Sequence, residues 1–155
     1  MSVLIGLGSN IGDRKSNLEK AEKILRSYSE ISVIDKSKII ETEPFGVIDQ
    51  PYFLNRVLKI KTDFKPTDLL AVCLDTEKKM GRIRVRKWGE RKIDVDILVF
   101  DEEIVNDDVL ILPHPGIAER KFVLESLVEI VPDEIHPVEK KTYAELYEEL
   151  ILNSK

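Results

Sequence analysis

The chain of 155 residues has one cysteine, Cys73, which excludes an internal disulfide and a zinc site built on cysteines. That cysteine lies among leucines, a setting typical of a buried structural thiol rather than a nucleophile. No apolar run is long enough to cross a membrane, so we expect no membrane span. The first residues lack a basic segment and a small-residue cleavage site, so we expect no signal peptide.

Two common nucleotide-binding motifs are also missing. The early glycines Gly6, Gly8 and Gly12 do not follow the G-x-G-x-x-G spacing, because position 11 is isoleucine, and no Walker lysine accompanies them. We therefore predict a short buried strand at 3–5, followed by a tight turn that contains the three glycines.

The composition is that of a globular chain with an acidic excess. Hydrophobic residues make up 43% and charged residues 34%, and the length suits a single domain, which we place at residues 1–155. The net charge is −5 and the sequence pI is about 5.2, whereas affinity for nucleic acid needs a broad basic surface. We therefore expect no nucleic-acid partner, and a small anionic ligand for the one loop in which cations gather.

Periodicity and capping signals predict alternating strands and helices. Alternating apolar residues indicate strands, and apolar residues three and four apart indicate helices. Strands are expected at 3–5, 31–42, 52–62 and 93–100, and helices after a cap at Asp13 or Ser16 and at 66–80, 120–130 and 142–152. The order is βαββαβ, which predicts an α+β, ferredoxin-like sandwich with an antiparallel sheet and additional C-terminal helices.

The helix expected at 66–80 carries two further predictions. Its core face comprises Leu69, Leu70, Cys73, Leu74 and Met80. Glu77 lies at the edge of that face, where position alone favours a solvated glutamate.

The stretch from Arg82 to Leu98, RIRVRKWGERKIDVDIL, combines cations with a pair of carboxylates. Six Lys and Arg side chains fall between residues 82 and 92. In the strand that follows, Asp94 and Asp96 share one face, because side chains alternate with a period of two. Two carboxylates this close can both be ionised only if a cation lies beside them. Mg²⁺ is a suitable cation, because it binds carboxylates together with substrate phosphates. The guanidinium groups can bind the phosphate oxygens. The stretch therefore predicts a site for a metal polyphosphate.

Two rival interpretations of this stretch stay open on the residues alone. A metal-dependent nucleotidyltransferase or nuclease also uses a D-x-D pair on such a sheet, although the acidic balance counts against it. A non-catalytic binding module would leave the carboxylates solvated on an edge strand. Magnesium-dependent binding of ATP would exclude this second rival.

Four segments resemble the 6-hydroxymethyl-7,8-dihydropterin pyrophosphokinase family, in the same order and over nearly the whole chain. They are GLGSNIGD, ETEPFGVIDQPYFLN, KWGERKIDVDIL and LPHPGIAERKFVLESLVEI. The resemblance implies a cytoplasmic enzyme of folate biosynthesis that transfers pyrophosphate from ATP to the hydroxymethyl group of 6-hydroxymethyl-7,8-dihydropterin and releases AMP. It further implies a monomer that associates weakly with the next enzyme of the pathway, and a mobile loop at the rim of the site carrying Ser9 and Asn10.

For the phosphate side of the site, the resemblance assigns metal, catalytic and nucleotide residues. Asp94 and Asp96 are expected to hold two Mg²⁺ ions and to act in catalysis with Arg82 and Arg91. The implied ATP-binding residues are Glu77, Arg84, Trp88, Arg91, Ile97, His114 and Arg120.

For the acceptor side, the resemblance implies two stacking rings, Phe53 and Phe122, and two hydrogen-bonding residues, Thr42 and Asn55. The full set of implied pterin-binding residues is Thr42, Glu43, Phe45, Phe53, Asn55, Trp88 and Phe122. Well-known members have tyrosine where Phe53 stands, which removes a hydroxyl and keeps the stacking face. Apolar Leu74, Val109 and Ile111 stand at positions that carry polar nucleotide contacts in the family, which leaves the strength of ATP binding open.

Overall fold

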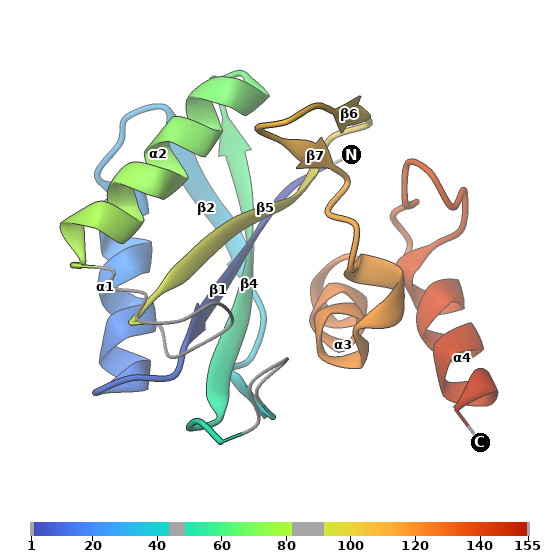
Figure 1. Cartoon of the computed structure of the whole chain (residues 1–155). Helices are drawn as coiled ribbons and strands as arrows, with labels where there is room; N and C mark the ends of the chain where they lie inside the picture. The colour runs from blue at the N-terminus through green and yellow to red at the C-terminus, as the bar shows by residue number, and fades with distance from the viewer. Residues whose placement is uncertain (1, 44–48, 82–91, 155) are drawn as a thin grey trace.

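The computed structural model describes residues 2–43, 49–81 and 92–154. Its strands are β1 (Val3–Ser9), β2 (Ile31–Lys36), β3 (Ile40–Thr42), β4 (Phe53–Thr62), β5 (Asp94–Phe100), β6 (Val105–Asn106) and β7 (Ile111–Leu112). Its helices are α1 (Arg14–Arg26), α2 (Pro66–Lys79), α3 (Lys121–Ile130) and α4 (Tyr143–Asn153), with a 3-10 turn, η1 (Ile117–Glu119), before α3 (Figure 1). Among the described residues, no helix has both the length and the apolar character needed to span a membrane.

The main sheet is antiparallel, with the strand order β2-β4-β1-β5, and β3 pairs with the same edge of β4 as β2 does. This arrangement confirms the predicted ferredoxin-like βαββαβ sandwich. The segment predicted as one strand at 31–42 forms two strands, β2 and β3. Between them, the backbone N–H of Ser37 donates to the carbonyl of Val57, and the hydroxyl of Ser37 accepts the N–H of Val57. Pairing with β4 then resumes at Ile40. The central position of β1 and the edge position of β5 follow from this order.

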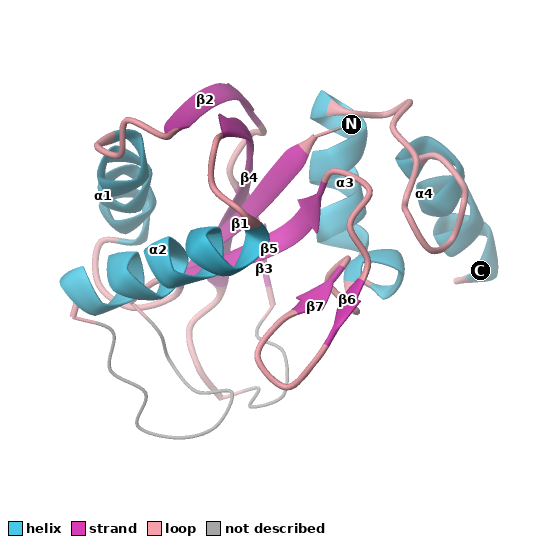
Figure 2. Cartoon of the chain, turned by 90° about the horizontal axis from the view of Figure 1, so that it is seen from above, coloured by secondary structure: helices cyan, strands magenta, loops and turns pink. Residues whose placement is uncertain are grey.

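Helices cover both faces of the sheet. Figures 1 and 2 show α1 and α2 on one side and α3 and α4 on the other. Ile5 and Leu7 of β1 pack in the core with residues of α1 and α2, whereas Leu4 and Leu98 pack with residues of α3 and α4. The additional C-terminal helices pack against the sheet through this second core.

The helix ends follow the predicted capping signals. Asp13 caps α1 by accepting the N–H of Ser16 at 3.1 Å, and Pro66 is the first residue of α2. Thr142 and Glu145 form a capping box at the start of α4. These local signals mark the residues at which the helices begin.

Two local predictions are wrong. Strand β1 continues through Gly6 and Gly8 as far as Ser9, and Gly12, with φ of 72°, occupies the turn before α1. Leu74 is 55% exposed, because the side of α2 that faces the sheet is formed by residues 69, 72, 73, 76 and 77. Cys73 is buried, as predicted.

Candidate active site

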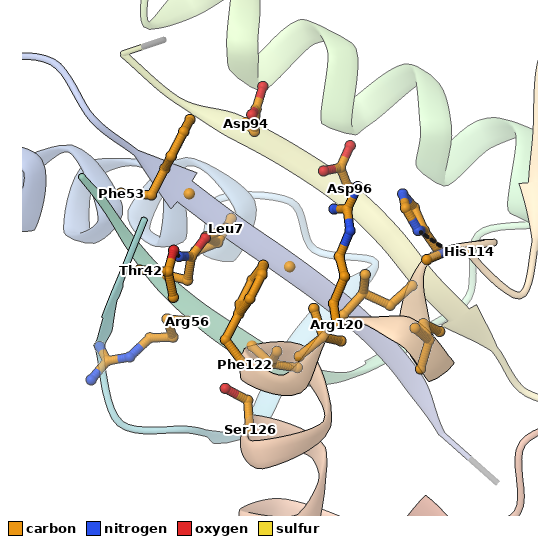
Figure 3. Close-up of a pocket in the computed structure, with 18 of the residues that line it drawn as sticks. Leu7, Thr42, Phe53, Arg56, Asp94, Asp96, His114, Arg120, Phe122 and Ser126 are labelled. Carbon is orange, nitrogen blue, oxygen red and sulfur yellow. Dashed lines mark hydrogen bonds between the residues drawn. The ribbon is translucent and has the colours of Figure 1, made fainter. Parts of the chain in front are cut away.

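An open pocket of about 830 Å³ lies on the face of the sheet that also carries α3 (Figure 3). Its walls come from β4, β5 and the segment between residues 114 and 126, and its floor comes from β1. The lining combines carboxylates, cations and aromatic rings: Asp94, Asp96, His114, Arg120, Phe53 and Phe122. The pocket therefore brings together the strand that carries the acid pair and the predicted stacking rings.

The floor of the pocket is the backbone of β1 at Gly6, Leu7 and Gly8. Gly6 and Gly8 face the pocket, because side chains alternate along a strand and Leu7 belongs to the core beneath α1 and α2. Gly8 pairs with Asn55 of β4 on one side and with Asp94 of β5 on the other. A Cβ atom at Gly8 would lie 3.0 Å from Asn55 Oδ1. The glycines thus keep a trough open between the polar side chains of the two neighbouring strands.

The acid pair projects from one face of β5, as predicted. Asp94 is half-buried and Asp96 is exposed, while Val95 between them packs in the opposite core. Among the described residues, no cluster of three or more His, Cys, Asp or Glu side chains could hold a metal ion. Two carboxylates suit Mg²⁺, which commonly takes one or two of them and completes its octahedral shell with water and substrate phosphates. The donor set therefore fits a magnesium ion that arrives with a polyphosphate.

Glu77 reaches the same strand from helix α2. Its side chain is buried, and its Oε2 accepts the N–H of Val95 at 2.8 Å. The expectation of a solvated glutamate is wrong, because the outer edge of β5 offers a backbone N–H that needs a partner. Burial, together with the charges of Asp96 and Glu77, raises the pKa of the Cys73 thiol to about 12 and keeps it protonated.

His114 forms part of the wall beyond the acid pair. Its backbone N–H donates to the carbonyl of Leu98 at 2.8 Å, and its Nδ1 accepts the N–H of Gly116 at 3.1 Å. The proton of the neutral ring is therefore on Nε2. Burial, and secondarily the charge of Arg120, lowers the pKa of His114, so the ring is neutral at neutral pH.

Arg120 depends on a glycine for its position. A Cβ atom at Gly116 would lie 2.9 Å from Arg120 Nε, so a side chain there would displace the guanidinium. Figure 3 shows that guanidinium directed towards Asp96. A cation beside the acid pair is suited to phosphate oxygens that a metal also contacts.

Two rings and an ordered amide form the other half of the pocket. Phe53 enters from the first residue of β4 and Phe122 from the first turn of α3 (Figure 3). Asn55 Nδ2 donates to Thr42 Oγ1 at 2.6 Å, which links β4 to β3 and orients the amide. Glu43 lies at the exposed rim. Ring faces with fixed polar groups between them are suited to a flat heteroaromatic ligand.

Two of the described residues implied in ATP binding, Glu77 and Ile97, do not line this pocket. Ile97 packs in the core beneath α1 and α2, on the face of β5 opposite Asp96, so its side chain is not available to a nucleotide in the pocket. Five further predicted residues lie outside the described part of the chain: Phe45, Arg82, Arg84, Trp88 and Arg91.

Ser9 and Asn10 are not in an exposed loop at the rim. Both are buried, and Asn10 Nδ2 donates to Gln50 Oε1 at 2.8 Å and to the carbonyl of Pro51 at 3.0 Å. Asn17 donates to Ser9 Oγ at 3.1 Å. These bonds tie the end of β1 to α1 and to the segment before β4.

Sequence reasoning missed the residues that give the pocket its shape. Gly6 and Gly8 alternate with Ile5 and Leu7, and this alternation, visible in the sequence, marks a strand with one bare face. Gly116 carried no such signal, because its role depends on the folded position of Arg120.

Comparisons with known proteins point to one family. Residues 4–132 match the family model described as 7,8-dihydro-6-hydroxymethylpterin-pyrophosphokinase (HPPK). The 2-amino-4-hydroxy-6-hydroxymethyldihydropteridine pyrophosphokinase of Methylorubrum extorquens is 45% identical over 129 residues, which are 83% of this chain and 82% of the relative. The protein of the same name from Aquifex aeolicus is 42% identical over 144 residues, 93% of this chain and 89% of the relative.

A solved structure shares the fold at low sequence identity. The crystal structure of wild-type Plasmodium falciparum HPPK-DHPS with pteroate superposes with a TM-score of 0.78 at 17% identity. The superposition covers 99% of this chain and 43% of the longer Plasmodium chain.

Proposed function

The chain belongs to the 7,8-dihydro-6-hydroxymethylpterin-pyrophosphokinase family, the pyrophosphokinases of folate synthesis, and we propose that its open pocket is where pyrophosphate passes from magnesium-bound ATP to the pterin. The acceptor is the hydroxymethyl group of 6-hydroxymethyl-7,8-dihydropterin, and AMP is released. One observation carries the proposal: Asn55 and Asp94 flank the bare backbone of Gly8, so an acceptor anchor and a metal ligand share one trough. Residues 1–155 form a single catalytic domain in this proposal.

The phosphate half of the reaction is assigned to β5 and the neighbouring wall. Asp94 and Asp96 would hold two Mg²⁺ ions jointly with the ATP phosphates, and bound magnesium neutralises phosphate charge. The guanidinium of Arg120 binds phosphate oxygens, and Nε2–H of His114 donates a further hydrogen bond. On the strength of the family resemblance, Arg82 and Arg91 act on the same phosphates, and Arg84 and Trp88 contact the nucleotide.

The acceptor half is assigned to the aromatic end of the pocket. Phe53 and Phe122 stack on the pterin ring, and Asn55 and Thr42 bind its polar edge. The ring is then fixed with its hydroxymethyl group above the glycine floor, facing the phosphates. The hydroxymethyl oxygen bonds to the β-phosphorus of ATP and gives up its proton to water, as the bond from that phosphorus to the AMP oxygen breaks.

We also propose a monomer of the cytoplasm that associates weakly with the next enzyme of folate synthesis. The Plasmodium chain joins HPPK to DHPS by name, and this chain corresponds to 43% of it. Sedimentation of the purified protein alone tests the monomer, and sedimentation with that enzyme tests the association.

Product analysis tests the proposed reaction. The protein is mixed with ATP, Mg²⁺ and 6-hydroxymethyl-7,8-dihydropterin, and control mixtures omit the pterin or the metal. AMP and pterin pyrophosphate should appear in equal amounts, in the complete mixture alone. ADP as the product would mean transfer of the γ-phosphoryl group and would overturn the proposal.

A further inference from the structure

The acceptor end of the pocket has two walls that come from elements far apart in the sequence. Thr42, whose Oγ1 accepts the amide of Asn55 at 2.6 Å, is the last residue of β3, and Phe122 lies in the first turn of α3. Both residues line the pocket. Binding of a flat ligand between a ring and a polar edge depends on the spacing of these two walls.

Strand β3 is held less securely than α3. It is three residues long, and among the described strands it pairs with β4 alone. Helix α3 is anchored by Leu124 and Leu127, which are fully buried in the second core. The segment that leads into β3 therefore needs further contacts to keep Thr42 in place.

Glu129 of α3 supplies such a contact. Both oxygens of its carboxylate accept the backbone N–H of Lys38, at 3.0 and 3.1 Å. Lys38 lies in the connection between β2 and β3. A hydrogen bond to a charged acceptor is stronger than one to a neutral acceptor. This bond therefore joins the helix that carries Phe122 to the segment that leads into Thr42.

Glu129 lies on the same side of α3 as the stacking ring. Phe122, Ser126 and Glu129 follow the i, i+4, i+7 spacing of one helix face, and Ser126 lines the pocket below Phe122 (Figure 3). Glu129 itself is exposed and is not among the described residues that line the pocket. Its carboxylate thus acts at the far end of the helix face whose near end forms the acceptor wall.

We propose that Glu129 is a positioning residue for the acceptor, which holds the segment entering β3 against α3 and so sets the spacing between Thr42 and Phe122. It acts through the backbone of Lys38 and does not touch the substrate. The inference rests on the proposed function, because it assigns the pterin to these two walls. Strands β4 and β1 lie between β3 and β5, so the phosphate half of the pocket should not depend on Glu129.

Substitutions at Glu129 separate this role from a purely structural one. Glu129→Ala removes the acceptor and should raise the Kd of the pterin about three- to tenfold, with the affinity for magnesium and ATP unchanged. Glu129→Gln keeps an oxygen acceptor on a side chain of the same length and should restore most of the pterin affinity. If Glu129→Ala fails to fold, Glu129→Asp, which withdraws the carboxylate by one methylene, gives the same comparison.

Glu125 provides a matched control on the same helix. Its carboxylate lies 3.8 Å from Lys121 Nζ and accepts the hydroxyl of Tyr147, a residue of α4, at 3.5 Å. These contacts join α3 to α4 and not to β3. Glu125→Ala should therefore lower the melting temperature and leave the Kd of the pterin unchanged.

Fluorescence titration with 6-hydroxymethyl-7,8-dihydropterin, and a separate titration with magnesium and a non-hydrolysable ATP analogue, measure the two affinities without turnover. The proposal is supported if Glu129→Ala weakens pterin binding alone and Glu129→Gln binds like wild type. It is overturned, with the proposed function intact, if wild type and Glu129→Ala bind the pterin equally well, or if Gln is as damaging as Ala. A wild-type protein that binds no pterin would overturn the proposed function and this inference together.

Discussion

Asn55 and Asp94 stand on opposite sides of Gly8, and each is its direct partner across the sheet. Neighbouring strands are about 4.8 Å apart, so the Cα atoms of the two residues are separated by about 10 Å. In the proposed reaction, the amide belongs to the acceptor half of the pocket and the carboxylate to the phosphate half. The two substrates would then meet in the trough between these side chains.

Gly8→Ala should weaken pterin binding more than ATP binding. The added Cβ would lie 3.0 Å from Asn55 Oδ1, so the amide must shift, whereas its distance of 3.6 Å from Phe53 Cδ1 is an ordinary van der Waals contact. Loss of one well-placed hydrogen bond costs about 1 kcal/mol, which corresponds to a rise of about 5-fold in the Kd of the pterin. Fluorescence titration with the pterin measures it. Gly6→Ala is the control, because its Cβ meets the adaptable side chain of Leu98 at 3.4 Å and should change the Kd less.

Asp94→Asn and Asp96→Asn should each abolish most turnover and leave the fold intact. Each change keeps the size of the side chain, so the packing of β5 is preserved, but it removes the negative charge that attracts magnesium. We expect a fall in kcat of about 100-fold or more, and a chelator should reduce wild-type activity to the same level. Circular dichroism verifies the fold, and a double variant that kept full activity would refute the metal assignment.

Thr42→Val should act on the pterin through Asn55. The substitution preserves the branched shape and removes the hydroxyl that accepts the Asn55 amide at 2.6 Å. The free amide loses its fixed orientation, so the Kd of the pterin should rise about 5- to 10-fold. Thr42→Ser keeps the hydroxyl and should bind like wild type. Additive effects of Thr42→Val and Asn55→Ala in the double variant would show that the two residues act separately.

His136 should make the protein less stable in mild acid. Its Nδ1 accepts the N–H groups of Val138 and Glu139 at 3.2 and 3.0 Å, and burial lowers its pKa below the ordinary value of 6.5, against the opposing charge of Glu139. The folded state favours the neutral ring. The stability it contributes is therefore present above about pH 6.5 and is lost as pH falls towards the folded pKa.

Urea unfolding of wild type and His136→Asn between pH 7 and pH 5 measures this loss. One histidine contributes at most about 1.4 kcal/mol per pH unit to the slope of the free energy of unfolding against pH, and the variant should lose that contribution. Part of the slope should persist, because the pKa of His114 is lowered as well. Identical slopes in the two proteins would contradict the prediction.

Periodic patterns in the sequence were enough to predict the fold. The β5 alternation placed Asp94 and Asp96 on one face, and the capping box placed α4 at Thr142. These features depend on neighbours within a few residues, so the sequence carries them directly. The family segments then identified the chemistry that the alternation left open.

Features that depend on distant contacts were harder to predict. Glu77 was expected in solvent, because its position on the helix does not reveal that the N–H of Val95, 18 residues later, lies within reach. Ser9 and Asn10 were expected in a loop, since their buried partners, Asn17 and Gln50, come from other elements. The open trough likewise exists only when Gly8 lies between two folded strands.

The hydrogen bonds along β5 also bear on how the molecule behaves among its own copies. An uncovered edge strand can pair with the edge of another molecule and begin aggregation. Here Glu77 occupies the N–H of Val95, and the N–H of His114 occupies the carbonyl of Leu98, so two of the groups that could recruit a foreign strand are already engaged. The exposed charge of Asp96 repels a second copy of the same strand. The contacts along this edge thus leave fewer backbone groups of β5 open to pairing with another copy of the chain.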